Sequence, residues 1–183
     1  MKLGIIGFPQ SGKKTLFKIL TGSVPATSSS VEVGIADILD SRFDTLVRMY
    51  APRKETRAKI NIELLPDIDE DAIREGGIFK NISDMDALCC VIRAFQSESA
   101  YHIKGSVDPQ RDLSAISSEL LLHDQLFAEK RLERIELSKK KSLKMNTEKE
   151  EALMHKISAH LDSGLPLRSL ELSPEECTII ASY

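Results

Sequence analysis

The apolar positions in the first half of the chain follow two patterns, short runs and helical spacings. The short or alternating runs predict strands at residues 1–6, 31–39, 59–65 and 87–95. Helical spacing predicts helices at residues 12–20 and 42–50, the second with an apolar side formed by Phe43, Leu46, Val47 and Tyr50. The nearly continuous apolar run at 87–95 is typical of a central strand covered on both faces. Strands that alternate with helices predict an α/β fold with a doubly wound sheet.

The second half of the chain predicts helices instead of strands. Asp108 and Pro109 form a helix start, because an N-cap residue precedes proline at the first helical position. Apolar residues then recur at helical spacing: Leu113, Ile116, Leu120 and Phe127. Thr147 and Glu150 have the spacing of a capping box. They open a second arm with an apolar side formed by Leu153, Ile157 and Leu161. The two arms predict an antiparallel helical hairpin.

Two segments of this half leave alternatives open. The lysine-rich connector at 139–144 is either a solvated turn or a contact for RNA phosphates. Residues 173–176, Ser-Pro-Glu-Glu, combine the signals of another helix start only a few residues before Tyr183. A helix with such clear starting signals rarely ends so soon, so we expect a truncated protein or a fragment.

The length and composition of the chain limit the classes of protein to which it can belong. The chain has 183 residues, enough for one domain or for one domain with an insertion. Its net charge of −3 excludes a global basic surface for nucleic acid. Three cysteines without metal-ligand spacing suit a reducing, cytoplasmic environment. The sequence contains no apolar run long enough to span a membrane.

The most informative motif lies between the first predicted strand and helix, where residues 7–13 read G-x-x-x-x-G-K. In that context the pattern indicates a phosphate-binding loop, or P-loop. Backbone N–H groups and the positive end of the following helix would bind an anion, and Lys13 would reach the β- and γ-phosphates. The residues expected to contact a nucleotide are Gly7, Pro9, Gln10, Ser11, Gly12, Lys13, Lys14 and Thr15. The alternative is a glycine-containing turn that binds nothing.

The position after Lys13 departs from the motif. It normally carries a Ser or Thr hydroxyl that binds Mg²⁺, and here it is Lys14. An ammonium group has donors only, so it cannot ligate a metal. Thr15 has a hydroxyl, but one residue along a helix turns the side chain by about 100°. The sequence therefore puts Mg²⁺ binding in question, and we assign no metal ligand. No Ser-His-Asp or Cys-His arrangement indicates a catalytic residue.

These residues resemble a known family. Residues 4–17 look like the opening of the YchF or Obg-like ATPase subfamily of translation-factor-related P-loop GTPases, whose usual run is G-I-V-G-L-P-N-V-G-K-S-T-L-F. Residues 102–112 are close to the stretch that enters the helical insertion of that family. The match continues at residues 118–122, 129–134 and 168–172, so it spans nearly the whole chain.

The resemblance implies a G domain interrupted by a helical coiled-coil insertion. Residues 1–106 would be the N-terminal part of an incomplete G domain, 107–164 the helical hairpin, and 165–183 the return segment with the start of a truncated helix. The family's base-reading motif and its C-terminal TGS domain would lie beyond Tyr183. The ligand implied is ATP or GTP, and the partner implied for the hairpin is the ribosome.

Two switch segments of the family are altered here. The acidic D-x-x-G segment should fall near residues 64–67, where no Asp precedes a Gly by three positions, and Asp67 belongs to an acidic surface loop. Near the switch threonine there are only Thr27 and Ser28. Three hypotheses follow from these departures. The first is a nucleotide-binding protein with slow or absent hydrolysis. The second is an active ATPase or GTPase with a substitute Mg²⁺ ligand, Thr15 or Asp67. The third is a non-enzymatic ribosome-interaction module.

Overall fold

The structure is a computed structural model that describes residues 1–25, 31–69, 77–140 and 147–181. The chain divides into two compact units, residues 1–114 and 115–183. Thr27 and Ser28, most of the acidic loop after Asp69 and most of the lysine-rich connector lie outside the described residues.

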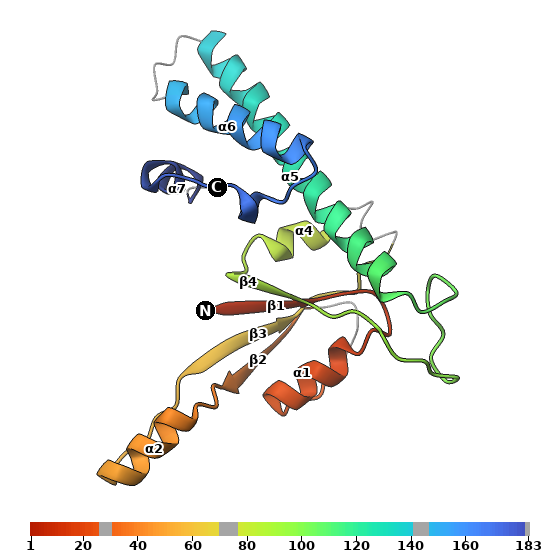
Figure 1. Cartoon of the computed structure of the whole chain (residues 1–183), viewed down its shortest axis with the longest axis vertical. Helices are drawn as coiled ribbons and strands as arrows, with labels where there is room; N and C mark the ends of the chain where they lie inside the picture. The colour runs from red at the N-terminus through yellow and green to blue at the C-terminus, as the bar shows by residue number, and fades with distance from the viewer. Residues whose placement is uncertain (26–30, 70–76, 141–146, 182–183) are drawn as a thin grey trace. The chain divides into compact units, whose positions relative to one another are not determined.

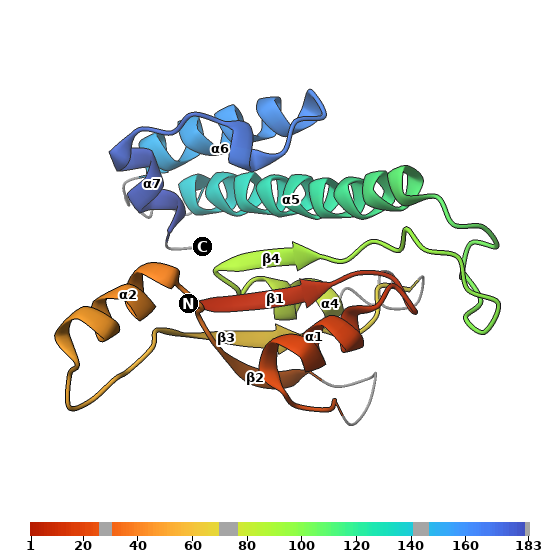
Figure 2. The same ribbon diagram turned by 60° about the horizontal axis from the view of Figure 1, so that its bottom comes forward.

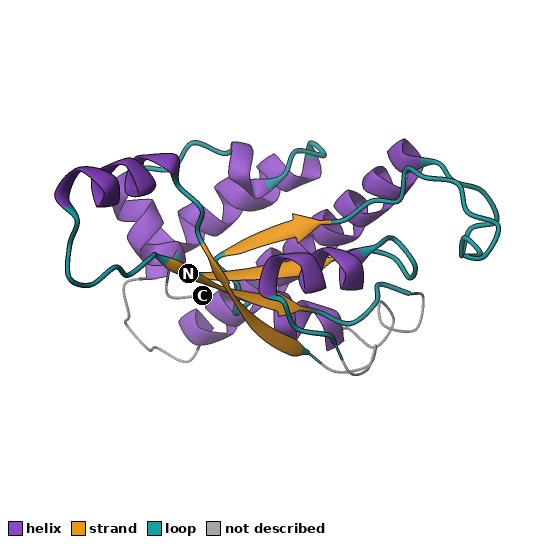
Figure 3. Cartoon of the chain, turned by 90° about the horizontal axis from the view of Figure 1, so that it is seen from below, coloured by secondary structure: helices purple, strands orange, loops and turns teal. Residues whose placement is uncertain are grey.

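The first unit is built on a four-stranded sheet with the order β2-β3-β1-β4. Its strands are β1 (Lys2–Ile6), β2 (Glu32–Asp37), β3 (Lys59–Leu64) and β4 (Ala87–Cys90). β1 pairs in parallel with β3 and β4, whereas β2 is antiparallel to β3. Figure 3 shows the strands as one twisted sheet among helices. The predicted α/β sheet is confirmed as an open, mixed sheet.

Two helices of this unit lie on opposite faces of the sheet, α1 (Lys13–Thr21) on one and α4 (Gly77–Ile82) on the other (Figures 1 and 2). The ring of Phe17 packs with Ile5, Ile62 and Leu64 in the core under α1. Gly34 of β2 allows this close approach, because a Cβ there would lie 2.5 Å from Cγ2 of Thr21. Ile19 of the same helix is 74% exposed, because only the Phe17 side of α1 meets the sheet.

One sequence prediction about this unit is wrong in the described structure. The run at 87–95 forms a four-residue strand at the edge of the sheet, and Cys89 and Cys90 there are only half-buried. The helix α2 (Ser41–Tyr50) forms as predicted, with Asp40 as its N-cap. No side chain of α2 is fully buried, although the structure describes all of them. An amphipathic pattern shows that a helix has an apolar side, but it does not supply a surface to cover it.

The second unit is a helical hairpin. α5 (Pro109–Lys140) begins in the first unit and runs antiparallel to α6 (Thr147–Asp162), as Figure 2 shows. Leu153, Ile157 and Leu161 are buried as predicted. On α5, Ile116 is buried as predicted and so are Ala128 and Ile135, whereas Leu113 and Phe127 are exposed. A 32-residue helix carries more apolar positions than one partner covers, so the register against α6 selects the buried set.

A 3-10 turn η1 (Leu167–Ser169) leads to α7 (Pro174–Ile180), where the predicted start is confirmed as a capping box between Ser173 and Glu176. Glu150, predicted to cap α6, instead pairs with Arg131 of α5, with 2.6 Å between Oε1 and Nε. The side chain of Thr147 lies outside the described residues. In the described ranges, no helix combines the length and apolar character that crossing a bilayer requires.

Candidate phosphate-binding site

The loop between β1 and α1 has a backbone that only small or strained residues adopt. Gly7 and Gly12 have positive φ angles of 151° and 98°. A Cβ on Gly7 would lie 2.3 Å from the carbonyl oxygen of Val91, so no other residue fits there. Gln10 adopts a left-handed φ of 57° without being glycine. Such a conformation costs about 1–3 kcal/mol and is concentrated at ligand sites.

The N-terminus of α1 is open toward an anion. Gly12 precedes the helix without a side-chain cap, and the first turn carries no acidic residue. The first N–H groups of a helix have no partner within it, and the helix dipole makes this end positive. Loop and helix together therefore form the anion-binding arrangement that the motif predicts.

Lys13 is buried beneath this loop, with 4% of its surface exposed. Its Nζ donates to the carbonyl oxygen of Gly7 at 2.7 Å and to that of Pro66 at 3.3 Å. It also pairs with Oδ1 of Asp67 at 2.7 Å. Burial lowers the pKa of Lys13 from its ordinary value, and Asp67 opposes that change. The ammonium is thus held within the loop by three oxygen atoms.

Asp67 is a site residue that the sequence analysis placed on an acidic surface loop. It follows β3, and the N–H of the next residue, Ile68, donates to the carbonyl oxygen of Gly7 at 3.2 Å. The carboxylate is 26% exposed and faces Lys13. One signal was available in the sequence. Asp67 follows a strand predicted to be parallel to the first, and parallel strands place their carboxyl ends at one edge.

The loop borders a cavity of about 490 Å³. Its lining consists of Pro9, Gln10, Ser11, Gly12, Lys13, Lys14, Thr15, Asp67, Phe95 and Ala100. The structure therefore brings seven of the eight predicted residues to one cavity, and Gly7 lies behind them as an acceptor for Lys13. Phe95 and Ala100 come from the segment after β4 and were not predicted. Their role in binding, like that of the eight, stays a prediction.

Ser11 contributes a buried hydroxyl group to this lining. Its Oγ is buried, and it has no hydrogen-bond partner among the described residues. A buried hydroxyl left unpaired costs about 1–3 kcal/mol. Such a group is satisfied when a ligand oxygen comes within reach.

The residues present do not fit Mg²⁺ in the manner usual for a P-loop. Lys14 occupies the hydroxyl position and is exposed at the cavity, and Asp67 is paired with Lys13. Among the described residues, no cluster of three or more His, Cys, Asp or Glu side chains is placed to hold a metal ion. Mg²⁺ requires oxygen ligands, and the position that usually supplies one here carries an ammonium group instead.

Sequence comparison identifies several proteins that are similar to this chain along nearly all of its residues. The chain is 34% identical over 193 residues to Obg-like ATPase 1 of Oryza sativa subsp. indica, covering 100% of this chain and 49% of that protein. It is 33% identical to Obg-like ATPase 1 of Schizosaccharomyces pombe, covering 100% and 50%. It is 30% identical to the ribosome-binding ATPase YchF of Bacillus subtilis, covering 97% and 51%. No protein-family model matches the chain.

A solved structure agrees with these relatives. The Schizosaccharomyces pombe YchF GTPase matches with a TM-score of 0.75 and 28% identity, over 100% of this chain and 52% of that one. The chain thus spans about half the length of the proteins it matches. A P-loop between β1 and α1, a helical hairpin after the fourth strand and this similarity along the whole sequence agree: the chain belongs to the YchF and Obg-like subfamily of P-loop proteins.

Proposed function

We propose that the first unit binds the triphosphate of a purine nucleotide, ATP or GTP, and hydrolyses it slowly or not at all. The observation that carries this proposal is the P-loop geometry, in which a buried lysine and an open helix N-terminus border one cavity. In this assignment, the backbone N–H groups from Gln10 to Thr15 bind the phosphate oxygens and Lys13 neutralises their charge.

Lys14 supports binding without the usual metal. Lys14 lines the cavity, one residue beyond Lys13. A second ammonium supplies part of the positive charge that Mg²⁺ brings to the phosphates elsewhere. Phosphoryl transfer depends on positioning and on a metal that neutralises developing charge. A lysine at position 14, in place of the usual hydroxyl residue, therefore reduces the rate of hydrolysis more than it reduces nucleotide affinity.

Calorimetric titration of the chain with ATP and with GTP, each with Mg²⁺ and with EDTA, tests this function. We expect binding that changes little when Mg²⁺ is removed. The Lys13→Ala variant should lose about a hundredfold in affinity, because it removes charge-assisted hydrogen bonds to two phosphates. Lys18→Ala, which removes an exposed lysine of the same helix, is the matched control. Absence of binding under all four conditions would refute the proposal.

Ribosome binding is a second candidate function, and the name of the Bacillus subtilis relative favours it. The second unit has its own apolar core and a charged outer side that includes Glu129, Lys130, Glu133 and Arg134. We assign the ribosome contact to this hairpin. In the same assignment, residues 1–106 are part of a G domain, residues 107–164 are the hairpin, and residues 165–183 are the return segment. Such a partner places the chain in the cytoplasm.

Co-sedimentation with ribosomal subunits tests the second candidate. If the hairpin carries the contact, the chain pellets with subunits, and Lys13→Ala pellets equally well without nucleotide. A chain that stays in the supernatant at every salt concentration would remove the ribosome from the assignment.

A further inference from the structure

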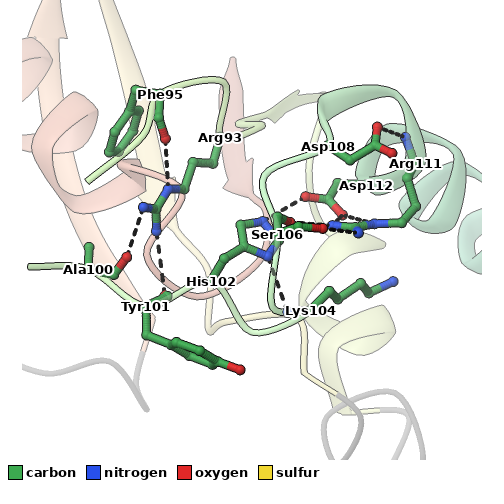
Figure 4. Close-up of polar contacts among 10 residues, drawn as sticks. All are labelled: Arg93, Phe95, Ala100, Tyr101, His102, Lys104, Ser106, Asp108, Arg111 and Asp112. Carbon is green, nitrogen blue, oxygen red and sulfur yellow. Dashed lines mark hydrogen bonds and ion pairs between the residues drawn. The ribbon is translucent and has the colours of Figure 1, made fainter. Parts of the chain in front are cut away.

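Residues 93–108, which make up most of the chain between β4 and α5, contribute Phe95 and Ala100 to the cavity. This stretch contains no helix or strand, yet side chains fix it at both ends. Figure 4 shows these contacts as two groups, one around Arg93 and one around His102. We call residues 93–108 the connecting segment.

Arg93 fixes the end of the connecting segment that lines the cavity. The side chain is 3% exposed. Its Nε donates to the carbonyl oxygen of Phe95 at 3.1 Å, and its Nη2 donates to that of Ala100 at 2.8 Å. Nη1 makes a longer contact of 3.5 Å with the carbonyl oxygen of Tyr101. The guanidinium carbon also lies 4.9 Å from the centre of the Phe95 ring. One planar side chain thus sets the positions of both lining residues.

His102 fixes the other end of the connecting segment. Its Nδ1 accepts the backbone N–H of Lys104 at 3.1 Å, so Nε2 carries the hydrogen and donates to Oδ2 of buried Asp112 at 2.9 Å. The amine of Lys104 lies 4.9 Å from the ring centre of Phe8, which belongs to the P-loop. The segment is therefore tied to the first turn of α5 and to the P-loop.

The lining formed by Phe95 and Ala100 differs from the P-loop side of the cavity. The P-loop side offers N–H groups and ammonium groups, which suit phosphates. The other side is lined by Ala100 and by Phe95, an aromatic residue that is 50% exposed. A flat aromatic surface suits a stacked base, whatever its hydrogen-bonding edge.

We propose that Arg93 is a positioning residue that holds Phe95 and Ala100 as a preformed surface for the base end of the nucleotide, an inference that rests on the proposed function. A surface ordered before binding loses less conformational freedom when the ligand arrives. Three separated carbonyl oxygens need the planar fork of an arginine, which a lysine with one nitrogen cannot reproduce.

The test compares ATP with inorganic tripolyphosphate, which has the phosphates but no base. Calorimetry on the full chain with Arg93→Met should give an ATP dissociation constant about tenfold higher, the equivalent of one base stack on an aromatic ring. The tripolyphosphate constant should stay within about twofold, because the P-loop is unchanged. Arg48→Met, the same substitution at an exposed arginine of α2, should change neither.

Each outcome decides the inference. Equal losses for ATP and tripolyphosphate, no loss for either, or a wild-type chain that binds tripolyphosphate as tightly as ATP would each overturn the role of Arg93. A wild-type chain that binds neither ligand would overturn the proposed function itself. If circular dichroism shows that Arg93→Met is unfolded, the milder Arg93→Lys decides by the same comparison, with a smaller but still ATP-selective loss expected.

Discussion

Among single residues, the ion pair between Lys13 and Asp67 has the most direct consequence for the site. The 2.7 Å contact commits the carboxylate to the ammonium that a phosphate would use. A triphosphate must therefore displace or share this contact, and the carboxylate also repels it. We therefore expect Asp67 to weaken phosphate binding, although it raises the pKa of Lys13 against the effect of burial.

The Asp67→Asn substitution separates these two effects. At neutral pH we expect ATP affinity to rise several-fold, because a repelling charge is removed. Burial already lowers the pKa of Lys13 and Asp67 raises it, so the variant should lower this pKa further. As the pH rises, Lys13 of the variant should therefore lose its proton earlier than Lys13 of the wild type. The ATP affinity of the variant should then begin to fall at a lower pH than that of the wild type. Calorimetry across a pH series measures both, and a variant that binds more weakly at neutral pH contradicts this account.

Lys14 stands at the position that usually supplies a ligand to Mg²⁺. Lys14→Ser restores the hydroxyl that P-loops use as a metal ligand. In EDTA we expect ATP affinity to fall about tenfold, as for loss of one charged hydrogen bond. With Mg²⁺ the affinity should recover, and turnover measured as phosphate release should rise. If the wild type with Mg²⁺ already releases phosphate well above the nucleotide-only background, and Lys14→Ser does not raise that rate, the chain is an active hydrolase and the metal-independent account is wrong.

Among the elements, α7 shows how one short helix is fixed to its neighbour. Ser173 Oγ accepts the N–H of Glu176, whose carboxylate accepts the N–H of Ser173 at 2.7 Å. Lys156 of α6 adds contacts of 2.9 and 3.0 Å to the same carboxylate. The Ser173 N–H first, and then Lys156, lower the pKa of Glu176 below its ordinary value. Both favour the ionised carboxylate.

The stability of this element should therefore depend on pH in a defined direction. A carboxyl group with a lowered pKa in the folded state stabilises it above the unfolded pKa, and the effect disappears as the pH falls through the folded pKa. We expect Glu176→Gln to be less stable than the wild type at neutral pH and equal to it in strong acid. Urea unfolding followed by circular dichroism measures this. Glu175→Gln, an exposed neighbour, should change stability less, and a pH-independent difference for Glu176→Gln would contradict the assignment.

For the whole molecule, each unit has its own apolar core. Ile5, Phe17 and Ile62 belong to the core of the first unit, and Ile157 and Leu161 belong to that of the second. The cavity is lined by residues of the first unit alone. Damage to the second core should therefore leave the phosphate site intact.

Leu161→Ala tests this independence. Leu161 is completely buried, and a buried leucine replaced by alanine costs about 2–5 kcal/mol. We expect the urea midpoint for the helical signal to fall while ATP affinity stays within about twofold. Leu122→Ala, at an exposed leucine of α5, should change neither. Loss of ATP binding with Leu161→Ala would show that the site depends on the second unit.

Local spacing along the chain determines which segments become helices and strands and where several of them end. Gly7, Gly12 and Lys13 identified the P-loop because a phosphate-binding turn needs those residue types at a fixed spacing within one short stretch of chain. Ser173 to Glu176 identified the start of α7 because a capping box is complete within four residues. Side chains that act within one turn of chain carry their signal in the sequence itself.

Contacts between distant segments were decided only by the tertiary structure. The sequence did not indicate that β4 lies at an edge of the sheet or that no side chain of α2 is fully buried. It also did not indicate that Ile135, and not Phe127, is buried in the core of the hairpin. Each of these features depends on which surface lies opposite. Asp67 reaches Lys13 and Phe95 reaches the cavity because parallel pairing of β3 and β4 with β1 brings their carboxyl ends to one edge. The sequence thus determined the P-loop motif and its place between a strand and a helix, and the pairing of strands determined which residues surround it.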